Sequence, residues 1–473
     1  MAWIDRGRNA LTERIVAVIG GAQGAVAAAL VTGKRGLIPE ETNEALRAAG
    51  IYHVVSISGL HMVLAAGLFM WTMRAALALS PSLALRRPIK KWAAAFAMVG
   101  AAAYDLFSGA EVATERALVM MLVVLGAVLA DRPAISMRNL AIAALIVLAR
   151  EPVTLLGPSF QMSFAAVAAM IAAFERHGGA REPDAPPSIL TRARQALLVM
   201  LATTLIAALA TDPYATFHFH RITLYGLVGN ALTLPLVEFV VMPAAVFGVL
   251  ASAFGLDAPV WWVMGQGVGF MMRVAEHVAT LPGAVRMIPA FGVGALLAMT
   301  LGLLWLTLWT TPLRCLGVAF AAAGVLLAGR ATAPDVMIDA RAQTLAFRGA
   351  DGRLASLNAQ ANPFGVAQWL AGDADPRGPR DPTLGAGGRC DPMGCVGVLR
   401  DGRRIALTLD AAALPEDCAR ADILVTRHVV RGPCAGPSLV LDGRHFAAAG
   451  ATHLHLAPEG PTLRTSRDPL YDR

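Results

Sequence analysis

The sequence predicts an all-α polytopic membrane bundle of about ten transmembrane helices, followed by a small β-rich extracytoplasmic domain at the C-terminus. Hydrophobic residues make up 56% of the 473 residues and charged residues only 15%, which is far more apolar than a soluble globular chain. Apolar runs of about 20 residues, long enough to cross a bilayer core, recur along the chain. They stop after Gly329, where short strand-like segments separated by Gly, Pro and Asp begin.

Residues 1–52 are amphipathic rather than membranous, and we expect this segment to lie on the membrane surface. Pro39 and the two glutamates after it predict a short helix that ends at Gly50. The N-terminus lacks the apolar core of a cleavable signal peptide. We therefore expect sequence upstream of residue 1, either because the start is internal to a longer gene or because the protein is naturally truncated.

Residues 53–329 are expected to form the membrane domain. Its ten candidate spans are 54–79, 89–107, 116–130, 139–149, 155–174, 195–211, 222–254, 259–281, 290–310 and 312–329. The segment 222–254 contains Pro235 and Pro243, which predict a kinked span or a re-entrant pair. Such a break is tolerated only where protein or water covers the freed backbone.

Charges in the loops orient the predicted bundle. The loops after the first, third and fifth spans carry clusters of arginine and lysine, so we expect them to be cytoplasmic. Ten spans then leave the C-terminal tail on the outer, periplasmic side. The net charge of +7 suits ordinary cytoplasmic loops as well as a nucleic-acid partner, and it does not decide between them.

The tail, residues 330–473, holds four of the five cysteines: Cys390, Cys395, Cys418 and Cys434. Their clustering predicts two disulfides in an oxidising compartment, with three connectivities possible. A four-thiolate zinc site is the rival, although the spacing of the first pair is loose for zinc.

The most distinctive stretch of the sequence is HVVSISGLHM, which begins at His53. Ser58, Gly59 and His61 interrupt an apolar segment there, and polar groups at that depth need a partner or water. Two interpretations stay open: packing between helices through small and hydrogen-bonding residues, and a functional polar path.

Four blocks in the same order resemble the ComEC competence family. They are AALVTG from Ala28 with AAGIYHVVSISGLHM from Ala48, ERALVMM from Glu115, GPSFQMSFAAV from Gly157, and FHFHRITLYGLVGNALTLPL from Phe217. The resemblance covers roughly residues 20–330. It implies a multi-pass channel of the bacterial inner membrane that passes single-stranded DNA during natural transformation. The partners it implies are single-stranded DNA, membrane lipid, a cytoplasmic helicase-like motor and an outer DNA receptor.

The chain departs from the family at both ends. Members typically carry an OB-like domain before the channel, and no such domain precedes residue 20. They also carry a metallo-β-lactamase-like domain, whose dense His-x-His-x-Asp-His cluster binds two metal ions. The tail offers only His428, His445, His453 and His455, so we expect no metal, no cofactor and no enzymatic activity. A degenerate relative of that domain remains an interpretation of the tail.

A path for DNA needs polar and cationic groups that neutralise phosphates without holding them too tightly. The candidates in the membrane or at its outer mouth are Ser58, Gly59, His61, Arg116, Gln161, His218, His220, Arg221 and Asn230. Arg116 could instead snorkel to the interface, and the two histidines beside phenylalanines could be interfacial anchors.

Acidic residues within the spans favour a different class of function. Glu238 and Asp212 would repel DNA but suit an ion-coupled secondary transporter of a small solute, which is the alternative prediction. An intramembrane hydrolase is a third interpretation, for which the sequence pairs no nucleophile with a base.

Overall fold

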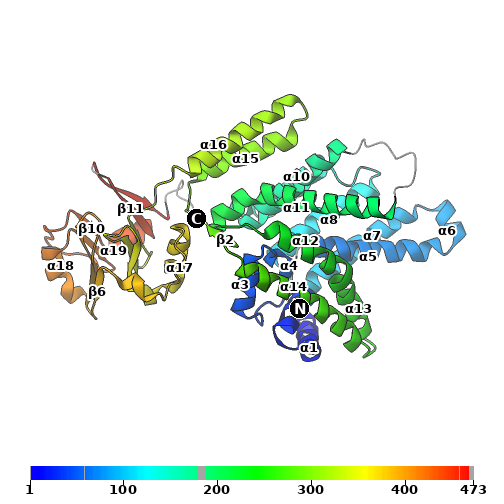
Figure 1. Cartoon of the computed structure of the whole chain (residues 1–473), viewed down its shortest axis with the longest axis horizontal. Coiled ribbons are helices and arrows are strands. Elements are labelled where there is room, and N and C mark those ends of the chain that lie inside the picture. Colours follow the sequence, from blue (N-terminus) through cyan, green and yellow to red (C-terminus); the bar gives the residue numbers. More distant parts are fainter. Residues whose placement is uncertain (1, 58, 178–187, 458, 468–473) are drawn as a thin grey trace. The chain divides into compact units, whose positions relative to one another are not determined.

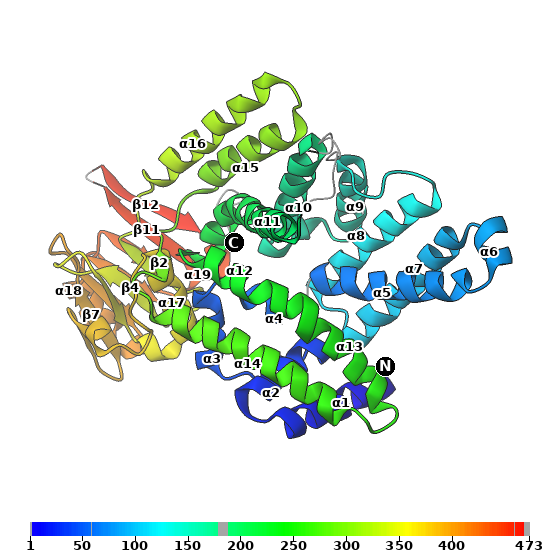
Figure 2. The same cartoon turned by 45° about the vertical axis from the view of Figure 1, so that its right-hand side comes forward.

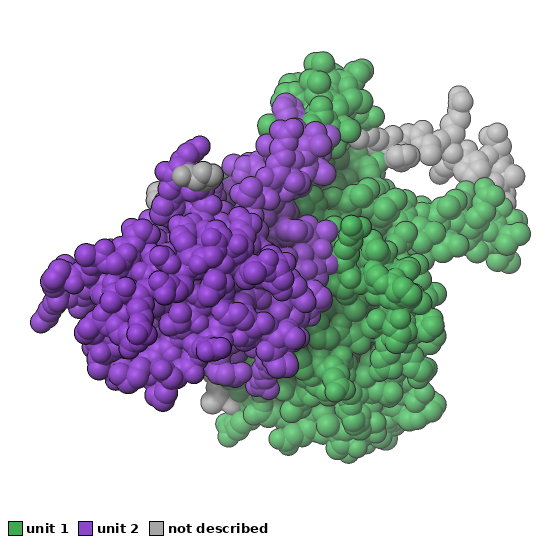
Figure 3. All heavy atoms as spheres, turned by 60° about the vertical axis from the view of Figure 1, so that its left-hand side comes forward, with its two compact units in different colours: residues 1–218, 222–286, 301–319 green, residues 219–221, 287–300, 320–473 purple. Residues whose placement is uncertain are grey.

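The structure, a computed structural model, describes residues 2–57, 59–177, 188–457 and 459–467. Ser58, one of the path candidates, lies outside the described residues. The chain divides into two compact units (Figure 3). The first comprises residues 1–218, 222–286 and 301–319, and the second comprises residues 219–221, 287–300 and 320–473.

The first unit begins with four helices. They are α1 (Ala2–Ile19), α2 (Gly21–Thr32), α3 (Glu40–Ala48) and the single turn α4 (Tyr52–Val55). Residues 24–32 of α2 are all buried, in a core that α2 shares with α14 (Ala258–Thr280). The small apolar residues of α2 thus pack inside the protein, while the position of residues 1–52 at the membrane surface stays a prediction.

Seven helices follow in the first unit. They are α5 (Gly59–Ala78), α6 (Pro81–Arg86), α7 (Ile89–Ser108), α8 (Val112–Leu129), α9 (Met137–Arg150), α10 (Pro158–His177) and α11 (Ile189–Phe219). Helices α5 and α7 lie side by side over most of their length (Figures 1 and 2). Gly100 of α7 permits this approach, because a Cβ there would lie 2.3 Å from the Phe69 ring.

The proline-containing segment forms a single span with a local change of helix type. Helix α12 (Gly226–Leu236) passes into a π-helical turn, Val237–Val241, and then into α13 (Met242–Ser252). Pro235 and Pro243 flank that turn. The structure thus accommodates the two prolines with a π-helical turn, not by reversing the chain.

Among the residues that the structure describes, four helical segments are long and apolar enough to cross a membrane: Gly59–Ala78, Val112–Leu129, Ile189–Phe219 and Gly226–Ser252. Two later apolar helices, α15 (Val293–Leu308) and α16 (Leu316–Ala328), are shorter. Helix α9 has 14 residues, about 21 Å against a bilayer core of roughly 30 Å. The apolar helices indicate a membrane protein, while the number of ten spans stays a prediction.

The second unit contains two five-stranded sheets. The antiparallel sheet has the order β12-β11-β3-β4-β5, with β12 Gly460–Thr465, β11 Thr452–Ala457, β3 Val336–Ile338, β4 Leu345–Arg348 and β5 Leu354–Leu357. The mixed sheet has the order β10-β9-β8-β7-β6, with β10 Leu439–Leu441, β9 Ile423–Thr426, β8 Arg404–Thr408, β7 Gly394–Val398 and β6 Gly388–Cys390. The predicted β-rich C-terminal region is confirmed.

The two sheets pack face to face around one apolar core. Phe347 of β4 reaches Gly397 of β7, where a Cβ would lie 2.7 Å from the ring. Helix α17 (Pro363–Gly372) covers the outer face of the antiparallel sheet, and α18 (Leu414–Arg420) covers the outer face of the mixed sheet. These helices, which the sequence analysis did not predict, make the domain a four-layer α/β/β/α sandwich.

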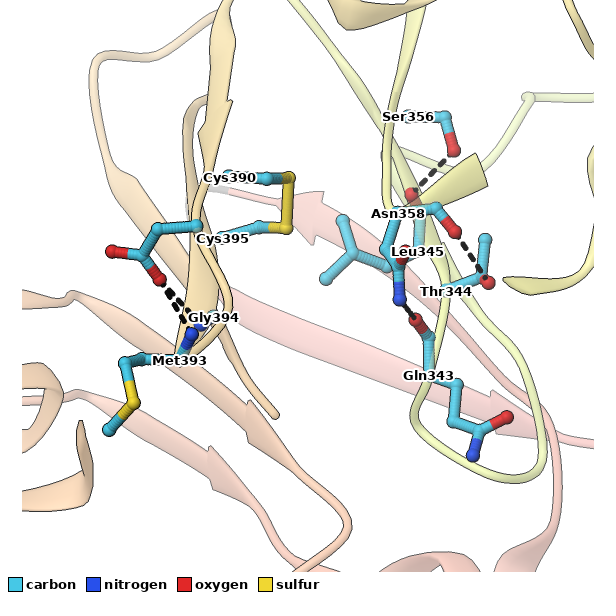
Figure 4. Close-up of a disulfide and its surroundings, with 10 residues drawn as sticks. Gln343, Thr344, Leu345, Ser356, Asn358, Cys390, Met393, Gly394 and Cys395 are labelled. Carbon is cyan, nitrogen blue, oxygen red and sulfur yellow. Dashed lines mark hydrogen bonds between the residues drawn. A yellow bond between two sulfur atoms is a disulfide. The ribbon is translucent and has the colours of Figure 1, made fainter. Parts of the chain in front are cut away.

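Two disulfides lie in the mixed sheet and its covering helix. Cys390 on β6 bonds to Cys395, the residue directly opposite on β7 (Figure 4). Cys418 on α18 bonds to Cys434. The structure thus adopts one of the three connectivities that the sequence left open.

Candidate site in the membrane domain

Three of the nine path candidates meet at the start of α10. Arg116 comes from α8, Gln161 from α10 and His218 from the C-terminal end of α11. Two serines of α10, Ser159 and Ser163, complete the group. We call these five residues the α10 polar cluster.

Arg116 is held by neutral hydroxyl groups. Its Nη1 donates to Ser159 Oγ at 2.6 Å and its Nη2 donates to Ser163 Oγ at 3.1 Å. The two serines are four residues apart and so lie on the same face of α10. Arg116 is only 8% exposed, and within the described residues no carboxylate forms an ion pair with it. The cluster therefore contains a buried positive charge that no carboxylate contacts directly, although Glu115 and Glu151 line the adjoining pocket.

Gln161 points to a different face of α10 and links it to α11. Its Nε2 donates to the carbonyl of Leu155 at 3.0 Å, which leaves Oε1 as an acceptor. His218 Nε2 lies 2.9 Å from that Oε1, so Nε2 carries the proton in this hydrogen bond. The imidazole therefore acts as a donor here.

An open pocket of about 200 Å³ adjoins Arg116 between α8, α9 and the turn Pro152–Leu156. Its charged lining residues are Glu115, Arg116, Arg150 and Glu151. Glu115 and Arg150 approach each other to 3.8 Å. Two acids and two arginines balance in charge, and the volume is below the usual 300 to 1,000 Å³ of ligand pockets. In this conformation the pocket is too small to hold a nucleotide strand.

Asn230 serves the packing of α12 against the N-terminal helices. Its amide donates to the carbonyl of Gly226 at 2.8 Å and to that of Gly50 at 3.4 Å. A Cβ at Gly229 would lie 2.4 Å from the carbonyl oxygen of Ala49. The glycines of this block thus permit backbone contact, and Asn230 bonds across it.

The remaining candidates lie apart from the cluster. Gly59 is the first residue of α5 and is exposed, while His61, in the same helical turn, is 1% exposed. His220 and Arg221 belong to the second unit. His220 has a φ of 55°, and its carbonyl accepts from Ile288 N–H at 2.9 Å.

Arg8 makes polar contacts that the sequence did not predict. Its guanidinium donates to the carbonyl of Thr32 at 2.7 and 3.1 Å and to that of Ser108 at 3.1 Å. These carbonyls lie at the C-terminal ends of α2 and α7, where a positive charge is favourable. Ser159 and Ser163 were missed as well. The only signal for them in the sequence is their residue type and their spacing of four residues on one helix.

Comparison with known proteins places these elements in a family. A family model described as competence protein matches residues 30–313, more than half of the chain, and this stretch contains the whole α10 polar cluster. The chain belongs to the competence protein family. The match confirms the resemblance to ComEC proteins seen in the sequence blocks.

Two curated relatives extend this comparison. The chain is 27% identical to ComE operon protein 3 of Bacillus subtilis over 232 residues, which are 48% of the chain and 27% of the relative. It is 35% identical to competence protein ComA of Neisseria gonorrhoeae over 144 residues, which are 30% of the chain and 20% of the relative. The aligned parts thus span about a quarter of these relatives or less. No solved structure matches the chain.

Proposed function

We propose that this competence-family protein is an inner-membrane channel for single-stranded DNA in natural transformation. The family supports a role in competence, and four apolar helices in the described part of the chain are long enough to cross a membrane. The path is assigned to residues 53–329. The domain formed by residues 330–473 is assigned to the periplasmic side, and residues 1–52 are assigned to an amphipathic N-terminal segment. The family does not favour the ion-coupled transporter.

The observation that carries this proposal is the pairing of Arg116 with serine hydroxyls. An arginine within an apolar span normally pairs with an acid or reaches the interface. Here two neutral oxygens fix the guanidinium and leave its charge available. A fixed cation without an ion-pair partner attracts a passing phosphodiester, and the hydroxyls prevent the guanidinium from moving with the strand.

Substitution of Arg116 tests the proposal. The gene would be expressed in a naturally transformable host that lacks its own copy, and transformation frequency would be measured at matched protein level. We expect Arg116→Gln to lower the frequency roughly tenfold or more, the effect of losing about 1.4 kcal/mol of interaction. Arg116→Lys keeps the charge and should retain part of the activity.

Arg192→Gln is the matched control, because Arg192 is exposed on α11 and lies outside the cluster. It removes the same charge and should leave the frequency unchanged. If Arg116→Gln and Arg192→Gln transform equally well, Arg116 takes no part in the path.

We further propose that the C-terminal sandwich is a diverged metallo-β-lactamase-like domain without hydrolytic function. Among the residues that the structure describes, no three His, Cys, Asp or Glu side chains stand together as a metal site. His453 and His455 lie on β11 opposite Arg464 and Thr462 of β12. The neighbouring arginine does not suit a cation site. The motor and the DNA receptor remain proposed partners.

A further inference from the structure

Glu238 is an ionisable side chain near the middle of a membrane span. It lies in Gly226–Ser252, a segment of 27 residues whose 18-residue window has a mean hydropathy of 2.1, the highest of the four candidate spans among the described residues. Glu238 is one residue from the midpoint of that segment. At 1.5 Å per residue, each end of the span is roughly 20 Å away along the helix axis. The carboxyl group is therefore placed at mid-depth of the membrane.

The backbone around Glu238 departs from the α-helix. Residues Val237–Val241 form the π-helical turn, in which Met242 N–H donates to the carbonyl of Val237 five residues earlier. Pro243 has no N–H to donate in the same way to the carbonyl of Glu238. The carbonyl of Glu238 therefore lacks the donor five residues later that the carbonyl of Val237 has. Single π-helical turns within helices frequently occur at functional sites.

The side chain of Glu238 does not enter the protein core. Val237 and Val241 are fully buried, and Val241 packs on Gly267 of α14, where a Cβ would lie 2.7 Å from its Cγ2. Glu238 is partly exposed, and Phe239 beside it is 77% exposed. Helix α14 runs beside the continuous segment formed by α12, the turn and α13 (Figure 2).

No charged group of these helices neutralises Glu238. Helices α12 and α13 contain no other charged or titratable side chain, and α14 carries Arg273, Glu276 and His277. Across the residues that the structure describes, Glu238 forms neither a hydrogen bond nor an ion pair. An ionised carboxylate at mid-depth without a cation is strongly unfavourable. The protonated acid is much less unfavourable at that depth, because it is neutral and can donate a hydrogen bond to a backbone carbonyl.

We propose that Glu238 is a proton-binding site at the middle of this span and that it is protonated at neutral pH. Its ligand is a proton exchanged with water that reaches the turn. The neutral form leaves no negative charge at mid-depth, and ionisation accompanies hydration of the π-helical turn. This assignment depends on the membrane position of Gly226–Ser252 and not on the proposed transport of DNA.

Carbodiimide labelling tests the proposal directly, because these reagents attack protonated carboxyl groups. The full chain in lipid vesicles would be treated with dicyclohexylcarbodiimide over a range of pH, and modified peptides would be identified by mass spectrometry. We expect Glu238 to be modified at neutral pH and the modification to decline in alkaline buffer. Glu238→Gln should abolish it. The control Glu111→Gln, which removes an acid ion-paired with Arg35 outside the spans, should leave it unchanged.

Infrared spectroscopy gives a second measurement that does not require reagent access. The carbonyl band of a protonated carboxylic acid should be present at neutral pH, shift in heavy water, and weaken in Glu238→Gln. If Glu238 is unmodified and Glu238→Gln leaves that band unchanged, the side chain is ionised and the proposal fails. If Glu238→Gln does not accumulate, two measurements still test the proposal. Glu238→Asp keeps the acid and should still be labelled, and the labelled peptide of the unsubstituted chain shows whether Glu238 itself is modified.

Discussion

At the scale of single residues, Asp257 joins two distant parts of the first unit. It is 2% exposed and accepts two hydrogen bonds from Arg14 of α1, at 3.0 and 3.1 Å. Trp261 Nε1 donates to it at 2.7 Å. The hydrogen bond from Arg14 is the main reason why the pKa of Asp257 falls to about 2. The carboxylate thus fixes α1 to the start of α14.

Asp257 should contribute stability at neutral pH and lose that contribution in acid. Because the pKa is near 2 in the folded protein and about 3.9 in an unfolded chain, the contribution is complete above pH 4 and disappears as the pH falls toward 2. We expect Asp257→Asn to lower the free energy of unfolding by the order of 1 kcal/mol at neutral pH. Thermal unfolding of the detergent-solubilised protein measures this.

Glu40→Gln is the comparison for Asp257→Asn, because Glu40 pairs with Arg47 at an exposed position and exposed pairs contribute little. Arg14→Ala is more informative still. This variant leaves the carboxylate of Asp257 buried without a cation. Acidification toward pH 4 protonates that carboxylate and removes the buried charge, so the free energies of unfolding of Arg14→Ala and of the unsubstituted protein should become more similar. Equal stability of Asp257→Asn and the unsubstituted protein at neutral pH would contradict the assigned role.

Sequence reasoning at this scale found polar residues but not their partners. Arg116, Gln161 and His218 were singled out because polar groups are rare in spans. The structure joins all three through α10. Their serine partners, and the pair Arg14 and Asp257, depend on contacts between helices far apart in the chain. A single sequence carries no information on such contacts beyond residue type.

At the scale of helices, glycine decides how closely neighbours approach. Gly229 of α12 contacts the backbone at Ala49, and Gly50, with a φ of 70°, lies against Gly226. This is a close backbone contact between the end of α3 and the start of α12. The sequence analysis noted small residues near His53 but did not connect Gly229 with this partner, which precedes it by well over a hundred residues.

Gly229→Ala should separate these helices. The added methyl group would lie 2.4 Å from the carbonyl oxygen of Ala49, so α12 must move, at a cost of about 1 to 3 kcal/mol. Gly126→Ala in α8 is the matched control, because nothing lies within 4 Å of its Cβ position and alanine favours a helix. Unfolding midpoints of the two variants should therefore differ clearly. Equal midpoints would show that the close contact is absent.

Long helices were easier to predict from the sequence than short ones. The proline-containing span was expected to be kinked, and it contains a π-helical turn. The outer helices of the sandwich, α17 and α18, escaped notice because each is short, at 10 and 7 residues. Hydrophobic periodicity is weak evidence over so few turns.

At the scale of the whole molecule, the oxidation state of the cysteines indicates the cellular compartment in which the sandwich lies. Four of the five form disulfides, and Cys315 is free and exposed. If the sandwich lies in the periplasm, oxidation there should form both bonds. Denaturation without reductant, followed by a thiol reagent, should label Cys315 alone, and prior reduction should expose all five.

Cys315→Ser is the control for that experiment, since it should abolish labelling in the absence of reductant. Labelling of all four tail cysteines in unreduced cells would mean that the sandwich lies in the cytoplasm. It would also contradict the orientation deduced from the loop charges.

The buried helix α2 has a consequence for how the protein is made. Its residues 24–32 are packed in a core completed by α14, yet α14 leaves the ribosome long after α2 does. Until α14 has been synthesised, the apolar side chains of α2 therefore lack the partner that buries them. The order of synthesis makes α14 the last part of this core to be made, so ribosomes that stop before it should release chains whose N-terminal helices are accessible to proteases.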